Sequence, residues 1–314
     1  MFSLPHDVLI IILQEATIKD ACHVSLTNKE HNALIKKEYK GSNEVISCSL
    51  KRWNTTFPNA RYLNIRNKKN ITGSDFKYLS MVEILNMSLC EQQSVTDHSF
   101  RSLSNLKDLN LQGACGHWIG GHHFTDALFD SLKDLEKFYI DNNHVITNRG
   151  IKKLVNIRDL TVHNCSNITD GISALITLKK LSIYNLRMTD DMFKPLINIE
   201  ELSMTFIDVT EVAISYLTNI KKFKNLSCKN IKYTNFDKLR HLINVDITHC
   251  KIQCLTSLSN IKKVSLYGCS VHNNDITYLT DAKGMIMKKC PVYRHLTIYN
   301  ESVQMSLCQC NYSI

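Results

Sequence analysis

Cysteine and histidine are the residues of this sequence whose chemistry stands out, because both bind metal ions and a cysteine thiolate is also a nucleophile. The chain holds 12 cysteines and 13 histidines among its 314 residues. Its tightest cysteine spacings are Cys250-x3-Cys254 and Cys308-x-Cys310. Neither is accompanied by a second cysteine or histidine pair at the spacing of a zinc site, so neither predicts a metal centre.

A further cluster of these residues is Cys115-Gly-His-Trp-Ile-Gly-Gly-His-His-Phe124. Its histidines invite a zinc hypothesis, but no carboxylate accompanies them. We interpret residues 115–124 instead as a binding loop that is anchored by Trp118, because tryptophan is enriched at the centres of protein interfaces.

Signatures of catalysis are missing from the sequence. It contains no nucleophile elbow, no phosphate-binding loop and no paired-carboxylate signature. The glycines at 116, 120 and 121 are not followed by Lys-Ser or Lys-Thr, as a loop that binds phosphate would require. The sequence therefore predicts neither an enzyme nor a bound cofactor or metal.

Half of the cysteines share one position in a repeating pattern. Each follows an apolar residue by five positions, as Cys165 follows Leu160. The six are Cys90, Cys165, Cys228, Cys250, Cys269 and Cys290. A thiol that recurs at one position of a repeat is typical of a small buried residue. We predict that these cysteines are reduced packing residues in the turn that leaves a strand.

The repeat has a strand-like first half. Apolar residues start matching stretches at Ile157, Leu178, Ile199 and Ile220, which are 21 residues apart. The pattern Leu-x-x-Leu-x-Leu recurs in about eleven units from residue 60 to about 300. Apolar residues two apart point to one face of a short strand.

The second half of each unit reads as a short helix. Ile168-Thr-Asp-Gly-Ile172 with Leu175 is a clear copy. The Thr-Asp pair can cap a helix N-terminus, and the apolar residues after it form a helical stripe. One unit cannot bury both of its apolar faces, so neighbouring units must stack.

These units resemble the cysteine-containing class of leucine-rich repeats. The resemblance covers about four-fifths of the chain and weakens at Asn225, which stands where an apolar strand residue belongs. It implies an α/β fold, a right-handed solenoid or horseshoe with a parallel sheet on its concave face. Strand residues that alternate with the core would then face a partner, and Tyr139, His163, Tyr184 and Tyr267 join Trp118 as predicted target-binding residues.

Residues 1–41 lie outside the repeat and are predicted to form three short helices. The segment Leu4-Pro-His-Asp-Val-Leu9…Ile12-Leu13…Ser25-Leu-Thr-Asn-Lys29 resembles an F-box. The resemblance implies docking on the Skp-type adaptor of an SCF ubiquitin ligase, while the repeats hold a target protein. The predicted docking residues are Leu4, Pro5, Val8, Leu9 and Ile12. The alternative is a stand-alone interaction scaffold in which these helices cap the open end of the solenoid.

Composition sets the remaining expectations. The formal net charge is +9, which favours an acidic partner, but we expect a solvated basic surface and no nucleic-acid ligand. The longest apolar run near the start, Val8 to Leu13, cannot span a bilayer and has no signal-peptide flanks. We expect no membrane partner and a cytoplasmic location, with the nucleus as an alternative. The predicted domains are residues 1–41, a linker or cap at 42–59, and repeats at 60–314.

Overall fold

The computed structural model describes residues 6–25, 29–90, 94–114, 124–228, 230–231, 236, 239–252, 261–271, 285–288, 290 and 303–306. The chain divides into two compact units, residues 1–157 and 158–314. Each unit is described by itself. No helix in the described ranges is long and apolar enough to cross a membrane.

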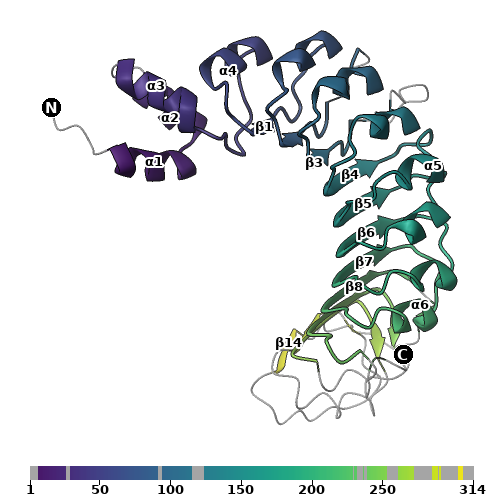
Figure 1. Ribbon diagram of the computed structural model, residues 1–314. Coiled ribbons are helices and arrows are strands. Elements are labelled where there is room, and N and C mark those ends of the chain that lie inside the picture. The colour runs from purple at the N-terminus through teal and green to yellow at the C-terminus, as the bar shows by residue number, and fades with distance from the viewer. Residues whose placement is uncertain are drawn as a thin grey trace. The chain divides into compact units, whose positions relative to one another are not determined.

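The first unit begins with the three predicted helices, which the structure confirms. They are α1 (His6–Glu15), α2 (Ile18–Ser25) and α3 (Lys29–Glu38), and both α1 and α2 pack on α3 (Figure 1). Thr17 starts α2 with a reciprocal cap. Its hydroxyl accepts the backbone N–H of Asp20 at 3.1 Å, and the Asp20 carboxylate accepts the backbone N–H of Thr17 at 3.2 Å.

Residues 42–59 form more than a linker, because they contain a fourth helix, α4 (Leu50–Thr56). The Ser49 hydroxyl caps this helix by accepting the backbone N–H of Arg52 at 3.2 Å. Trp53 and Phe57 are buried, and the backbone N–H of Ile46 donates to the carbonyl of Asn64 on the first strand at 3.0 Å. This segment therefore covers the open end of the first repeat.

Four parallel strands follow in the first unit, β1 (Tyr62–Asn64), β2 (Ile84–Asn86), β3 (Asp108–Asn110) and β4 (Lys137–Asp141). Each is followed by a short helix: η1 (Gly73–Tyr78), η2 (Asp97–Ser102), η3 (Asp126–Asp130) and α5 (Asn148–Ile151). The key apolar residues Leu63, Leu85, Leu109 and Phe138 pair in register and are buried. The predicted strand-then-helix unit is confirmed here.

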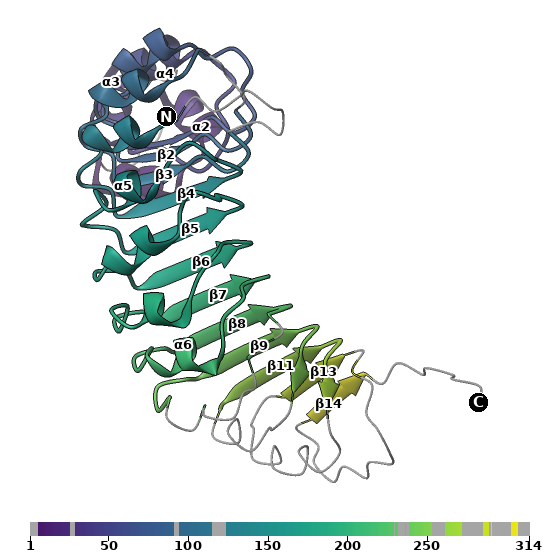
Figure 2. The ribbon, with the colours of Figure 1, turned by 90° about the vertical axis from the view of Figure 1, so that its right-hand side faces the viewer.

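The second unit continues the same pattern (Figure 2). Its parallel strands are β5 (Asp159–His163), β6 (Lys180–Tyr184), β7 (Glu201–Thr205), β8 (Lys222–Leu226), β9 (Asn244–Thr248), β11 (Lys263–Tyr267), β13 (Met285–Lys288) and β14 (Val303–Ser306). A second, two-stranded sheet pairs β10 (Lys251–Ile252) with β12 (Ser270–Val271). Strand β14 lies beyond the last predicted repeat.

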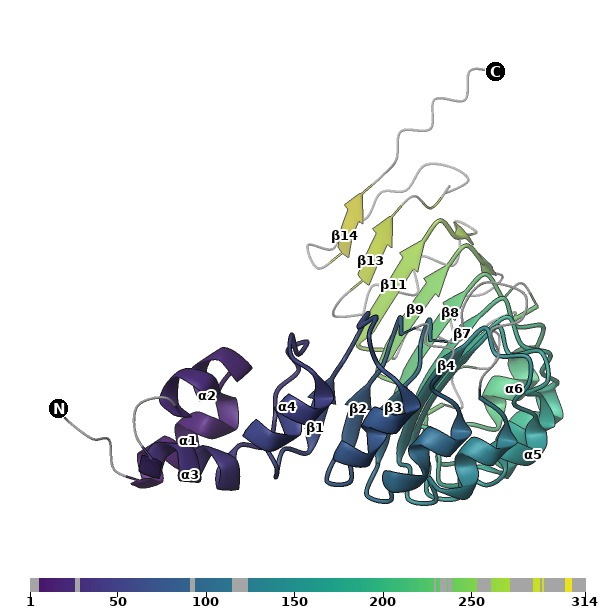
Figure 3. The same ribbon diagram turned by 90° about the horizontal axis from the view of Figure 1, so that it is seen from above.

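Short helices cover one face of the sheet in the second unit. They are η4 (Asp170–Ala174), η5 (Asp190–Phe193) and α6 (Glu211–Ser215), and Figure 3 shows α6 on one side of the strands. Along a strand, buried side chains that face the helices alternate with accessible side chains on the open face. The parallel pairing predicted between Leu160–Val162 and Leu181–Ile183 is confirmed, because Leu160 pairs with Leu181 and Val162 with Ile183.

The Thr-Asp pairs join neighbouring repeats as well as starting helices. The threonine is the N-cap residue of its own helix, as predicted, for example Thr125 before η3. The aspartate accepts hydrogen bonds from the threonine of the next repeat. Asp190 accepts the backbone N–H of Thr210 at 2.8 Å and its hydroxyl at 2.6 Å, and Asp126 binds Thr147 in the same way.

This contact predicts a measurable loss of stability. In Asp190→Ala the N–H and hydroxyl of Thr210 lose a charged acceptor, so the free energy of unfolding should fall by about 1–2 kcal/mol. The neighbouring Asp191 is exposed and serves as the matched control, since an exposed substitution changes stability by about 0.5 kcal/mol or less. Chemical denaturation measures both variants. Equal stability of the two would show that the contact contributes nothing.

The recurring cysteines pack inside the repeats. The prediction that Cys165, Cys228 and Cys250 are buried is confirmed, and none of these three thiols forms a disulfide. Cys90 shows how such a thiol is held, because its Sγ donates to the carbonyl of Ile65 in the preceding repeat at 2.9 Å. Burial raises the pKa of the Cys228 thiol to about 11, so this thiol stays protonated at neutral pH.

Two asparagines are also buried inside the repeats. Asn143 takes the repeat position of the cysteines and accepts the backbone N–H groups of Val145 and Ile146 at 2.9 and 2.7 Å. Asn225, the irregular strand residue, is also buried. Its Oδ1 accepts the backbone N–H of Cys228 at 3.2 Å and its Nδ2 donates to the Cys228 carbonyl at 3.4 Å. Both amides are hydrogen-bonded, which makes their burial tolerable.

Candidate binding surface

The open face of the sheet in the second unit carries three rows of side chains. The rows arise because the strands are parallel and in register, so equivalent residues of successive repeats lie side by side. The row at the strand starts is Lys180, Glu201, Lys222, Asn244 and Lys263. The middle row is Ser182, Ser203, Lys224, Asp246 and Ser265. The row at the strand ends is His163, Tyr184, Thr205, Leu226, Thr248 and Tyr267.

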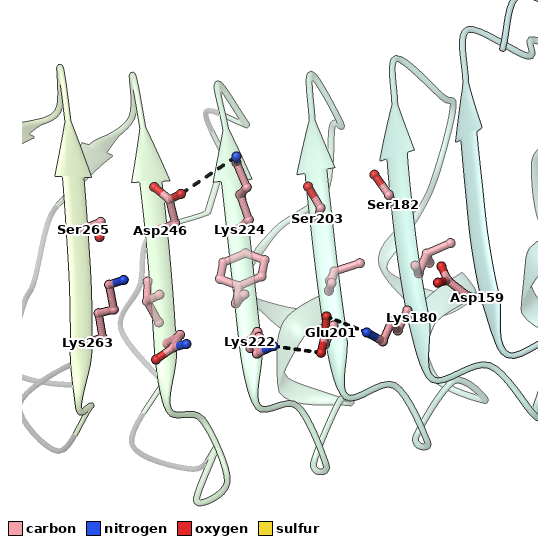
Figure 4. Close-up of a pocket in the computed structure, with 15 residues that line it drawn as sticks. Asp159, Lys180, Ser182, Glu201, Ser203, Lys222, Lys224, Asp246, Lys263 and Ser265 are labelled. Atoms are coloured by element: carbon pink, nitrogen blue, oxygen red, sulfur yellow. Dashed lines mark hydrogen bonds and ion pairs between the residues drawn. The ribbon is translucent and has the colours of Figure 1, made fainter. Parts of the chain in front are cut away.

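The first two rows line a groove of about 410 Å³ that runs across the strands (Figure 4). Its walls include Asp159 on β5 and the ammonium groups of four lysines. It is also lined by the serines of the middle row and by core residues such as Leu202 and Phe223. The groove therefore offers hydrogen-bond donors and acceptors above an apolar base, which suits a peptide or protein surface.

Ion pairs organise one wall of the groove. Glu201 lies between Lys180 and Lys222, at 3.3 and 3.0 Å from their Nζ atoms (Figure 4). Burial alone would raise the pKa of Glu201, but hydrogen bonds from Lys222 and Lys180 outweigh it and lower that pKa. A second ladder beside it pairs Glu200 with Lys221 at 2.7 Å and with Lys179 at 3.2 Å.

The lysine–glutamate ion pairs help to decide whether this wall suits a protein or a nucleic acid. The lysine pairs at 179–180, 221–222 and 262–263 form a basic stripe in the sequence. In the structure each ammonium group of the first two pairs has a carboxylate partner. Lys224 pairs with Asp246 at 3.9 Å. A phosphate backbone needs cations whose charge is not already balanced. Glu200 and Glu201 balance only half of the charge of the four lysines at 179–180 and 221–222, so the wall alternates in charge and keeps a net positive charge that an acidic side chain of a protein ligand can meet.

An aromatic cluster stands at the strand ends. The rings of His163 and Tyr184 lie 5.8 Å apart, and those of Tyr184 and Phe206 lie 5.6 Å apart with an edge-to-face arrangement. His163 also contacts the Ser182 hydroxyl at 3.3 Å. The structure thus brings two of the predicted target-binding residues together and adds a third aromatic residue, Phe206.

Phe206 combines exposure with an unfavourable backbone. Its side chain is 54% exposed and its φ is +51°. The equivalent residues of the two preceding repeats are Asn164 and Asn185, which also have positive φ. Asparagine tolerates this left-handed conformation far better than a bulky residue does. An exposed phenylalanine at such a position costs stability and gains the fold little, which points to a role on the surface.

The other predicted residues are placed differently. Tyr267 lies at the far end of the same row, beside His249 at 5.6 Å between ring centroids. Tyr139 is half-buried on β4 in the first unit. Trp118 and the rest of residues 115–123 lie outside the described residues, as do Leu4 and Pro5. Within the described residues, no three His, Cys, Asp or Glu side chains are grouped as a metal ion requires.

Helix α1 presents an apolar stripe to solvent. Val8, Ile11 and Ile12 are 39%, 65% and 43% exposed. Their spacing of three and four residues places them on one side of the helix. Leu9, by contrast, is only 6% exposed and packs inside the helical segment together with Leu13. Ile11 was not among the docking residues predicted from the sequence, although its helical spacing from Val8 marks the same stripe.

Comparison with known proteins supports the fold. No model of a protein family matches the chain, and no curated protein matches its sequence. Among solved structures, an internalin from Listeria monocytogenes is similar, with a TM-score of 0.53 and 14% sequence identity over 78% of this chain and 84% of the internalin chain. Together with the stacked parallel units, this similarity shows a leucine-rich-repeat solenoid.

Proposed function

Because the chain has a leucine-rich-repeat fold, we propose that it is a protein-interaction scaffold that binds its target on the open sheet face of the second unit. The observation that carries this proposal is Phe206. A strained, exposed aromatic residue beside Tyr184 and His163 is the kind of anchor that dominates interface energetics. The adjacent groove supplies the polar contacts that orient a partner.

The target is a protein segment that lies across the strands. Such a segment meets the aromatic cluster at the strand ends and the serine and lysine rows below it. The paired lysines and glutamates offer both charges, so a partner with alternating charges fits this wall better than one of a single sign. Of the four lysines that line the groove, Lys180, Lys222 and Lys224 form ion pairs with carboxylates of the same face. The fourth, Lys263, adds a site for an acidic side chain of the partner.

We further propose that the N-terminal helices dock on the Skp-type adaptor of an SCF ubiquitin ligase, so that the bound target is presented for ubiquitin transfer. The support is the exposed stripe of Val8, Ile11 and Ile12. If α1 sealed the first repeat, these side chains would be covered by it. Ile46, Trp53 and Phe57 take that covering role instead, which leaves the stripe available for a partner.

Co-purification tests the adaptor role. The full chain, mixed with a purified Skp-type adaptor, should elute as a stable complex in size-exclusion chromatography. The stand-alone scaffold is the second candidate function. If the adaptor elutes apart from the chain at micromolar concentrations, the ubiquitin-ligase role is wrong, and the sheet face alone carries the function.

A further inference from the structure

Cysteines of successive repeats form a column beside the strand ends of the second unit. Cys228, Cys250, Cys269 and Cys290 each follow the last residue of a strand by two positions, and those last residues are paired in register. Neighbouring strands lie about 4.8 Å apart. That separation falls within the range of about 4.4–6.8 Å between Cα atoms that a disulfide bridges.

The last two thiols of this column are in contact. The side chains of Cys269 and Cys290 are near enough to interact with each other, and the Cys269 Sγ also donates to the carbonyl of Ile247 at 3.3 Å. Cys269 is buried, whereas Cys290 is only partly buried. The Cys290 sulfur also lies near the backbone N–H groups of Cys269 and Gly268, which favour a negative charge there.

This environment separates the two thiols chemically. The hydrogen bond from Cys269, helped by the backbone N–H groups, lowers the pKa of Cys290 to about 7, although burial acts in the opposite direction. The hydrogen bond to Cys290 and burial raise the pKa of Cys269. The partly exposed sulfur therefore ionises more readily than its buried neighbour, and the thiolate is the form that reacts with oxidants.

We propose that Cys290 is a peroxide-reactive thiol and that Cys269 is its resolving partner, so that oxidation links two neighbouring repeats by a disulfide. The inference is independent of the target and of the adaptor, because it rests on the contact of these two thiols alone. Cys228 and Cys250 are less suited as the reactive thiol because both are buried.

The reaction balances with hydrogen peroxide as the oxidant. The Cys290 thiolate attacks one peroxide oxygen, the O–O bond breaks, and a sulfenic acid and hydroxide form. The Cys269 sulfur then attacks the sulfenic sulfur and the S–O bond breaks. The hydroxyl group leaves as water with the proton of the Cys269 thiol, and the S–S bond forms. Overall, two thiols are oxidised to one disulfide, and one molecule of hydrogen peroxide is reduced to two molecules of water.

The link would tie β13 to β11. Strand β11 carries Lys263 and Ser265, which line the binding groove. A disulfide that encloses residues 270–289 restricts the unfolded chain and so stabilises this end of the sheet. Oxidation would therefore make the C-terminal edge of the groove more resistant to local opening.

Peptide mapping of the full chain tests the proposal. Reduced protein is treated with hydrogen peroxide at neutral pH, the remaining thiols are alkylated, and the protein is digested without reductant. The expected product is a linked pair of peptides containing Cys269 and Cys290, lighter by two hydrogen atoms than the reduced pair. Cys290→Ser should abolish it, and Cys165→Ser, which removes a buried thiol outside the column, should leave it unchanged.

A second variant checks the order of steps. In Cys269→Ser the sulfenic acid at Cys290 has no resolving thiol, so dimedone, a reagent for sulfenic acids, should label Cys290 several-fold more than in the wild type. Formation of another pair, such as Cys250 with Cys269, in equal amount would overturn the proposal. So would the absence of any linked peptide from the peroxide-treated wild type.

Discussion

Replacing Val8 and Ile12 together with aspartate should abolish adaptor binding and leave the folded chain intact. Two carboxylates in an apolar interface lose their hydration without gaining partners. We expect the affinity to fall more than 100-fold, which corresponds to about 3 kcal/mol. Val8 is 39% and Ile12 43% exposed in the free protein, so the free energy of unfolding should stay within about 1 kcal/mol of the wild type.

A matched control is Ile176→Asp, because Ile176 is 59% exposed but lies in the second unit. It should retain adaptor binding, measured by calorimetry alongside the double variant. Leu13→Ala gives the opposite pattern, since Leu13 is buried, and its loss should lower stability by about 2–4 kcal/mol. If the double variant binds as the wild type does, the stripe on α1 is not the docking surface.

Phe206→Asn should weaken target binding about 10- to 100-fold while changing stability little. The substitution removes an aromatic anchor, whose loss typically costs about 1.5–3 kcal/mol of binding free energy. In the free protein, relief of the left-handed strain of about 1 kcal/mol offsets the lost contact with Tyr184. Binding can be measured with a target captured by the wild-type chain and then purified, and stability by thermal unfolding.

Leu89 provides a control that matches Phe206 in backbone and exposure. It is exposed, has φ +62° and occupies the equivalent turn position in the first unit. Leu89→Asn makes the same kind of change away from the aromatic cluster, so target affinity should be retained. An equal loss of affinity in both variants, or in neither, would contradict the assignment of the target site to the second unit.

The repeats were readable from the sequence because their register is physically constrained. A shift of one residue would move every core residue of a strand to the open face. The spacing of Leu160, Leu181 and Leu202 therefore predicts the pairing that the structure shows. The Thr-Asp pairs predicted the helix starts because threonine is a preferred N-cap residue and recurs at the same position of each repeat. That Asp190 binds the next repeat could not be read from one unit, because the contact exists only after stacking.

The candidate site was harder to predict because exposed positions carry no periodic constraint. Tyr184 and His163 were found from strand alternation, but Phe206 lies one residue past the strand and was missed. The sequence does hold a signal for Phe206. At the same position of the two preceding repeats stand Asn164 and Asn185, so a phenylalanine there departs from the pattern. The helix α4 was missed because residues 42–59 belong to no repeat, and its cap at Ser49 is a single local feature.

The alternating charges at the strand starts have a consequence for how such a chain can change over time. Tandem arrays gain and lose whole modules when their genes recombine. Here the module that carries Glu200 and Glu201 separates two modules that carry lysine pairs at the same place. Its deletion would set Lys179 and Lys180 directly against Lys221 and Lys222, and its duplication would set glutamates against glutamates. Like charges on adjacent strands repel. A protein in which one of these modules was deleted or duplicated would therefore be less stable at the strand starts.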